Sequence, residues 1–246
     1  MNTNTNKSIW PWVVSAVVVG CLLALGLALF HKSAKPTGKS VDYLSLGDVR
    51  QANGNWDGAI DAYTKAIKLN PNNEDACRNR GDAKQRKNDW EGAIADYTKA
   101  IELKPDDENA DRNRGDAKQR KHDWEGAIAD YTQAIKLKPD DADAYRNRGD
   151  AEQGKNDWDG AIADYTQAIK LKPDDADAYR NRGDAKQRKQ DWDGAIADYT
   201  KAVELKPDDA SAYHNRGDAK KAKGDLDGAS ADYSKAIELK PDLTSH

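Results

Sequence analysis

The stretch AYRNRGDAKQRKQDWDGAIADYTKAVELKP, Ala178–Pro207, decides the fold of this chain. In its second half, apolar residues from Trp192 to Tyr199 recur at three- and four-residue spacing, which is typical of an amphipathic helix. Asp191 is a suitable N-cap, and Pro207 ends the helix because it has no amide donor. The first half predicts another helix, closed by a residue that tolerates the left-handed conformation. The stretch is therefore predicted to be a helical hairpin.

The same hairpin recurs along the chain with a period of 34 residues. A tryptophan, or a leucine in the last copy, marks each second helix: Trp56, Trp90, Trp124, Trp158, Trp192 and Leu226. A period of this length is typical of stacked helical repeats. The periodic tryptophans are predicted to form part of the core. We predict six copies, over residues 40–73, 74–107, 108–141, 142–175, 176–209 and 210–243. The remaining segments are an N-terminal tail (1–8), a hydrophobic segment (9–30), a linker (31–39) and a C-terminal tail (244–246).

Five positions of the hairpin hold the same residue in every copy. In the fifth copy they are Gly183, Ala195, Tyr199, Ala202 and Pro207. This pattern resembles the tetratricopeptide repeat family, and the resemblance covers the chain beyond the linker. It implies an all-α fold, a right-handed superhelix of six hairpins whose first helices line a concave groove. It also implies that the groove binds other proteins.

The hydrophobic segment from Ile9 to Phe30 carries no charge. A helix needs about 20 such residues to cross a bilayer core, and Trp10 and Trp12 stand where an interfacial aromatic belt would lie. We therefore predict a transmembrane helix over residues 9–30. A cleaved signal peptide and a lipoprotein signal are the alternatives, the latter because VVGC ends at Cys21 in the manner of a loose lipobox.

Flanking charges favour one orientation of this span. Lys7 precedes it, whereas three lysines follow it: Lys32, Lys35 and Lys39. The excess of positive charge on the cytoplasmic side of membrane helices then places the repeats in the cytoplasm. We predict a single-pass membrane protein with cytoplasmic repeats.

Composition argues against several function classes. The chain has 39 basic and 43 acidic residues, interleaved throughout, so it lacks the clustered cations of a nucleic-acid surface. Cys21 and Cys77 lie far apart and give no disulfide framework or metal-ligand spacing. The four histidines are scattered, at His31, His122, His214 and His246. No nucleophile stands beside a base at helical spacing, so we predict no enzyme activity, no metal and no cofactor.

An arginine stands in the first helix where the family pattern has a large apolar residue. Only the first copy keeps that pattern, with Leu46, and it carries Ala62 across the hairpin. The other five copies combine arginine with aspartate: Arg80 with Asp96, Arg114 with Asp130, Arg148 with Asp164, Arg182 with Asp198, and Arg216 with Asp232. This exchange predicts an ion pair that joins the two helices of each hairpin. Recent duplication of the copies is the alternative explanation.

A second recurring set lies on the first-helix face that the family turns toward its groove. The set, called here the asparagine ladder, is Asn79, Asn113, Asn147, Asn181 and Asn215. Such amides can hold the backbone of an extended peptide, as in the superhelix of O-linked N-acetylglucosamine transferase, which the ladder resembles. The alternative is that they only cap or solvate the helix.

Arginines neighbour the ladder, each with an aspartate four residues further on. They are Arg78, Arg112, Arg146 and Arg180. We assign them to the same groove and expect each to pair with the aspartate of its own helix. A chaperone-type carboxylate clamp is disfavoured, because Asp75 and Asp82 stand where that clamp has lysine and asparagine.

Two copies are atypical. The third has Asp111 where later copies have tyrosine, so its first helix should exchange amide hydrogen sooner than the other internal first helices. The sixth has Ser230 in place of isoleucine, but it keeps Ile237, so its end is only partly capped. The primary hypothesis is a membrane-anchored scaffold that binds a protein or peptide segment. Self-assembly as a homo-oligomer, through the span and the exposed end, is the alternative.

Overall fold

The computed structural model describes residues 39–240, with side chains from Tyr43 onward. This part of the chain forms twelve α-helices and no β-strand. The helices are α2 (Lys39–Ala52), α3 (Trp56–Leu69), α4 (Glu74–Arg86), α5 (Trp90–Leu103), α6 (Glu108–Arg120), α7 (Trp124–Leu137), α8 (Ala142–Gly154), α9 (Trp158–Leu171), α10 (Ala176–Arg188), α11 (Trp192–Leu205), α12 (Ala210–Ala222) and α13 (Leu226–Leu239). The prediction of an all-α solenoid of six hairpins is confirmed.

The hydrophobic segment 9–30 lies outside the described residues, as do both predicted tails and the linker up to residue 38. Between residues 39 and 240, no helix is long and apolar enough to span a membrane. The predicted transmembrane helix therefore stays a prediction.

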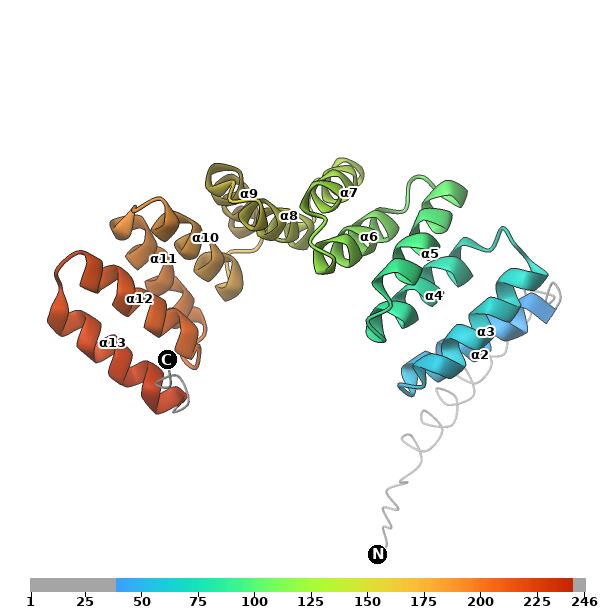
Figure 1. Ribbon diagram of the computed structural model, residues 1–246, viewed down its shortest axis with the longest axis horizontal. Coiled ribbons are helices and arrows are strands. Elements are labelled where there is room, and N and C mark those ends of the chain that lie inside the picture. Colours follow the sequence, from blue (N-terminus) through green and yellow to red (C-terminus); the bar gives the residue numbers. More distant parts are fainter. Residues whose placement is uncertain (1–38, 241–246) are drawn as a thin grey trace, which may run out of the picture.

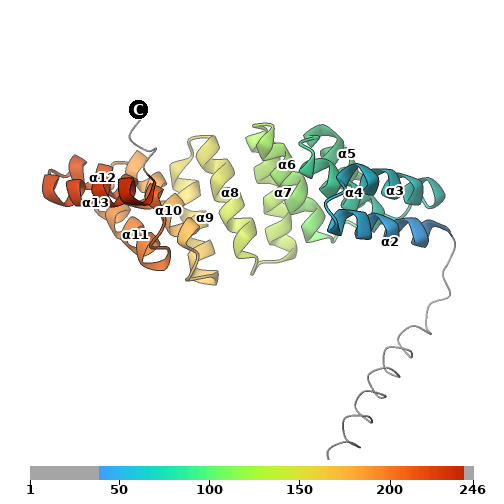
Figure 2. The ribbon, with the colours of Figure 1, turned by 90° about the horizontal axis from the view of Figure 1, so that it is seen from below.

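The six hairpins stack side by side into an arc (Figure 1). Each second helix packs against its own first helix and against the first helix of the next hairpin. Consecutive first helices also contact one another, whereas consecutive second helices do not do so within residues 39–240. The even-numbered helices therefore lie on the inner side of the arc, and the view from below shows the same succession of hairpins (Figure 2).

Side-chain caps fix where the helices begin. The N-cap Asp191 accepts a hydrogen bond from the amide of Gly194 at 3.0 Å, and Asp175 does the same for Ala178 at 3.1 Å. One residue of the turn between the two helices has a positive φ in every hairpin: Gly54, Asn88, His122, Asn156, Gln190 and Gly224. The left-handed conformation predicted for such turns is thus adopted, although glutamine, at Gln190, is an unusual residue for it.

Tyrosine, and not tryptophan, fills the interior of each hairpin. Tyr199 has no exposed surface and packs against Ala195 and against Ala219 of the next hairpin. A Cβ atom on Gly183 would lie 2.7 Å from a ring carbon of Tyr199, so only glycine allows this approach. Trp192 is half-buried at the edge of the cluster, so the prediction that the tryptophans form the core is wrong. As the first residue of its helix, it lies beside the turn and keeps part of its ring open.

The structure brings together both members of all five predicted ion pairs. The Arg182 guanidinium donates two hydrogen bonds to Asp198, at 2.9 and 2.6 Å, and Asp198 is only 4% exposed. Lys186 adds a second cation at 2.8 Å from the same carboxylate. The remaining Nη1 of Arg182 donates to Thr166 of the preceding hairpin at 3.1 Å, so the arginine also connects neighbouring repeats. Equivalent bonds join the other four pairs.

Two carboxylates, one buried and one half-buried, depart from this regular pattern. Asp111 is 1% exposed, and Glu152 replaces the lysine found beside the Arg–Asp pair in other hairpins. Each has a buried oxygen without a hydrogen-bond partner among the described residues. Burial raises the pKa of Asp111 to about 6, and burial together with the charge of Asp164 raises the pKa of Glu152 to about 7. The third and fourth hairpins therefore contain electrostatically unfavourable positions.

The ion pairs lead to a stability prediction. Replacing Asp198 with alanine should lower the free energy of unfolding by about 1–3 kcal/mol, because two part-buried cations lose their carboxylate. Urea denaturation followed by circular dichroism measures the loss. The matched control is Asp208→Ala, which removes an exposed aspartate without side-chain partners among the described residues. Equal losses in the two variants would show that the pair does not stabilise the hairpin.

The buried Asp111 leads to a pH-dependent prediction. Its folded-state pKa of about 6 exceeds the ordinary value of 3.8, so its ionisation costs stability as the pH rises between these values. Asp111→Asn should therefore raise the free energy of unfolding at pH 7 by on the order of 2 kcal/mol, and much less at pH 4. Amide hydrogen exchange in α6 should slow in the same variant. An identical gain at both pH values would contradict this explanation.

Candidate functional site

Similar pockets line the inner face of the arc at the second, third and fifth hairpins. Three of them have volumes of about 560, 570 and 600 Å³. Each is walled by a tryptophan from the start of a second helix, by aspartate, glutamine and arginine from first helices, and by an asparagine of the next first helix. The second pocket is typical, with Gln85, Asp116, Gln119, Arg120, His122, Trp124, Asn147 and Asp150. We refer to this row of pockets as the groove.

An aspartate stands at the centre of each junction, and it is half-buried at every junction but the first. Asp116 Oδ1 accepts hydrogen bonds from the Tyr131 hydroxyl of its own hairpin at 2.7 Å and from the Asn147 amide of the next hairpin at 3.0 Å. The same two bonds occur at Asp48, Asp82, Asp150 and Asp184. One carboxylate oxygen thus ties together two helices of one repeat and the first helix of the next.

The environment keeps these groups in their hydrogen-bonded states. Burial raises the pKa of Asp116 above its usual value, although the hydrogen bond of Tyr131, the charge of Arg112 and the hydrogen bond of Asn147 act in the opposite direction. Burial and the adjacent carboxylate raise the pKa of Tyr131 above its usual range, so its hydroxyl stays a donor at neutral pH. The last tyrosine, Tyr233, is less buried, and its pKa is raised to about 12.

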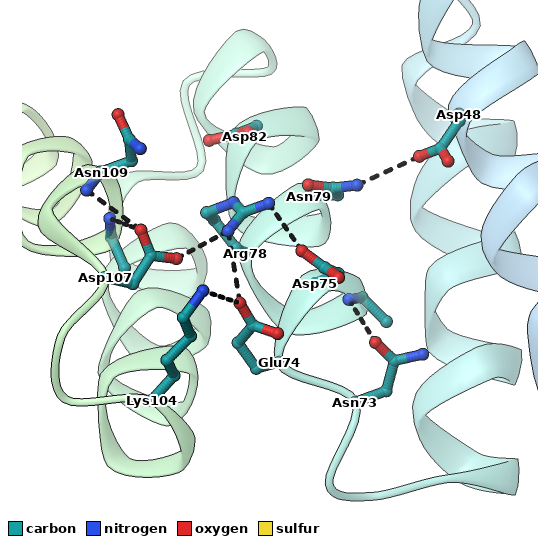
Figure 3. A network of polar contacts seen from close by, with 12 residues as sticks. Asp48, Asn73, Glu74, Asp75, Arg78, Asn79, Asp82, Lys104, Asp107 and Asn109 are labelled. Carbon is teal, nitrogen blue, oxygen red and sulfur yellow. Dashed lines mark hydrogen bonds and ion pairs between the residues drawn. The ribbon is translucent and has the colours of Figure 1, made fainter.

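The asparagine ladder lies at this junction. Asn113, Asn147 and Asn215 line pockets, as predicted for groove residues. Each of the five amides, however, uses one N–H to bind the aspartate of the preceding hairpin, and Figure 3 shows Asn79 directed toward Asp48 in this way. The ladder therefore contributes to stacking. The remaining N–H of each amide is available to a ligand, as is the carbonyl oxygen of each except Asn181, which accepts from Arg180 at 3.4 Å.

The arginines assigned to the groove bind elsewhere. Arg78 lies between Asp75 and Asp107, and it donates to Asp107 of the next hairpin at 2.6 Å (Figure 3). The same bond joins Arg112 to Asp141, Arg146 to Asp175, and Arg180 to Asp209. The expected pairing with the aspartate four residues on, Asp82, is wrong, because that carboxylate accepts from Tyr97 and Asn113 instead. None of these four arginines lines the three pockets.

The position of Asp107 explains why Arg78 binds it and not Asp82. One oxygen of Asp107 caps the N-terminus of α6, and the other accepts a hydrogen bond from Arg78. A single residue thus starts a helix and joins two repeats. Burial opposes the charge of Asp107, but the hydrogen bond and charge of Arg78 hold its pKa below the usual value.

Three arginines that the sequence analysis did not single out do line the pockets: Arg86, Arg120 and Arg188. They are exposed and form no ion pair or hydrogen bond with residues 43–240. The guanidinium groups of Arg86 and Arg188 lie 5.9 Å from the ring centres of Trp56 and Trp158. Their signal in the sequence is an arginine four residues after the junction aspartate.

Family models match most of the chain. Models described as tetratricopeptide repeat match residues 116–183 and 210–243, and a model described as TPR repeat matches residues 47–88, 81–122 and 188–224. Together they cover residues 47–183 and 188–243. No curated protein matches the chain in sequence.

Solved structures share the fold. A MamA structure is 29% identical, with a TM-score of 0.63, over 68% of this chain and 97% of MamA. YrrB, described as a TPR protein with an unusual peptide-binding site, is 24% identical, with a TM-score of 0.64, over 75% of this chain and 95% of YrrB. The pilF protein of Pseudomonas aeruginosa is 18% identical, with a TM-score of 0.70, over 82% of this chain and 92% of its own. The last two similarities concern the fold alone.

Proposed function

This chain belongs to the tetratricopeptide repeat family, and we propose that its groove binds an extended segment of another protein at a membrane surface. The fold is that of a protein–protein interaction scaffold. The binding of an extended segment and the membrane attachment are the finer parts of the proposal, and each rests on its own observation.

The observation that carries the proposal is the repetition of one pocket along the inner face. The pockets recur at hairpin junctions and combine an aromatic ring with polar side chains. A ligand that contacts several of them must extend along the arc, and an extended peptide presents a backbone donor and acceptor at every residue. The remaining N–H of each ladder asparagine, and the carbonyl of each except Asn181, can bind such groups without reading side chains.

The membrane part of the proposal rests on sequence. The uncharged segment 9–30 would hold the groove near the bilayer, with the repeats on the cytoplasmic side. A scaffold held in this way raises the local concentration of its partner at the membrane.

Self-assembly is supported by Leu226 and Ile237, which are 65% and 42% exposed on the last hairpin. The first hairpin does not offer the matching surface, however. Ser45 stands where later copies have the ladder asparagine, and Asn53 where they have the lysine that pairs across each junction. End-to-end stacking would therefore lack both junction bonds.

We expect the full-length protein in detergent to sediment as a monomer, and a concentration-dependent polymer would favour self-assembly.

The ladder provides the test of peptide binding. Asn147→Ala and Asp116→Ala both remove the Asn147–Asp116 hydrogen bond, but only the first removes the amide. If the ladder holds the ligand, Asn147→Ala should weaken partner binding by about tenfold, the equivalent of one hydrogen bond. Asp116→Ala should bind at least as well as the wild type, because it frees an N–H.

The partner for this test is obtained by affinity capture with the full-length protein, and its affinity for each variant is then measured directly. Circular dichroism confirms that both variants are folded. Equal weakening by the two variants would mean that the amide acts through stacking, and retention of the partner by both would place binding outside the groove.

A further inference from the structure

We propose that the groove selects an acidic segment, whose aspartate or glutamate side chains bind Arg86, Arg120 and Arg188. This inference rests on the proposed function, and it adds the chemical class of the partner. It starts from an imbalance between the charged groups of the groove.

The negative charges of the groove already have hydrogen-bond donors. Asp82 accepts from Tyr97 and Asn113, and Asp116 accepts from Tyr131 and Asn147. The three arginines have no acceptor among the described residues, although a guanidinium carries five N–H donors. A ligand therefore gains most when it supplies acceptors to these arginines.

The tryptophan rings prepare the arginines for this role. Trp56 and Trp158 lie under the guanidinium groups of Arg86 and Arg188, and such contact restrains the group while its edge N–H groups stay accessible. A carboxylate matches two of these parallel N–H groups in a bidentate hydrogen bond. Arg120 lines two successive pockets, so it can serve a ligand that runs from one to the next.

The arginine is absent from some repeats, so a matching ligand should carry acidic residues only opposite the repeats that have it. Arg86 and Arg120 lie one repeat apart, Gly154 takes the next position, Arg188 follows, and Ala222 ends the row. A Cβ atom on Gly154 would lie 2.8 Å from the ring of Trp124, so the ring occupies the space that an arginine stem needs. The ligand is therefore expected to be acidic opposite two successive repeats and apolar opposite Trp124.

The neighbouring aspartates favour carboxylates over phosphates. The charge of Arg86 acts on Asp82, and that of Arg120 acts on Asp116, so each arginine is close to one carboxylate. A singly charged group meets less repulsion there than a dianionic phosphate. The chain as a whole has a net charge of −4, so this selectivity depends on the local arginines and not on overall attraction.

The test uses the full-length protein in detergent and a fluorescently labelled poly(L-glutamate) peptide, with poly(L-lysine) of the same length as the opposite probe. Fluorescence anisotropy gives the affinities. The combined variant R86Q/R120Q/R188Q should weaken poly(L-glutamate) binding by about tenfold for each arginine removed. The single variant Arg120→Gln should account for about tenfold, which preserves the test if the combined variant is poorly folded.

The matched control replaces three exposed lysines on second helices, in the variant K68Q/K136Q/K170Q. It changes the net charge equally and should leave the affinity near that of the wild type. An equal loss in this control, equal binding of poly(L-lysine), or absence of poly(L-glutamate) binding to the wild type would overturn the inference. If the captured partner binds R86Q/R120Q/R188Q as well as the wild type but loses affinity in Asn147→Ala alone, the groove function stands and the acidic selectivity falls.

Discussion

The structure depends on an aspartate carboxylate, half-buried at all junctions but the first, that recurs between the hairpins. Asp116 receives a phenol hydrogen from Tyr131 and an amide hydrogen from Asn147 on one oxygen, so three helices meet at a single acceptor. This matters because the core consists mostly of alanine, which buries little apolar area per residue. Alanine and glycine allow the helices to approach closely, and the tyrosine ring fills the space between them. The hydroxyl and its carboxylate then fix the ring in position.

Charged side chains also join each repeat to the next. Buried ion pairs add little net stability, because desolvation offsets much of their attraction, but they penalise any arrangement that leaves a charge unpaired. Arg182 binds Asp198 within the hairpin and Thr166 in the hairpin before it, and Arg180 binds Asp209 in the hairpin after it. Each junction thus has a fixed register. The first hairpin has Leu46 in place of the arginine that binds the preceding hairpin in the other copies.

Much of the fold could be predicted from sequence because its signals are local or strictly periodic. Caps such as Asp191, the helix-ending prolines and the apolar spacing place the helices. The pairing of Arg182 with Asp198 could be expected only because Leu46 and Ala62 change together in the first copy. The partner of each ladder asparagine lies 31 residues earlier in another hairpin, and no helical spacing rule reaches it. For Arg78, the four-residue rule indicated Asp82, but the capping Asp107, 29 residues away, binds it instead. Tryptophan spacing indicated the correct helix face but not that the ring lies at the open edge of the groove.

These contacts also decide where binding specificity can reside. Most polar groups of the inner face bind one another, so a position can distinguish ligands only if its side chain is not needed for stacking. The position occupied by Arg86, Arg120, Gly154, Arg188 and Ala222 meets that condition, since its members form no hydrogen bond or ion pair through their side chains with residues 43–240. It also varies among otherwise similar copies. A solenoid of nearly identical repeats can therefore present a non-uniform surface, because the residues that hold the stack together are constant while the residue beside each tryptophan changes.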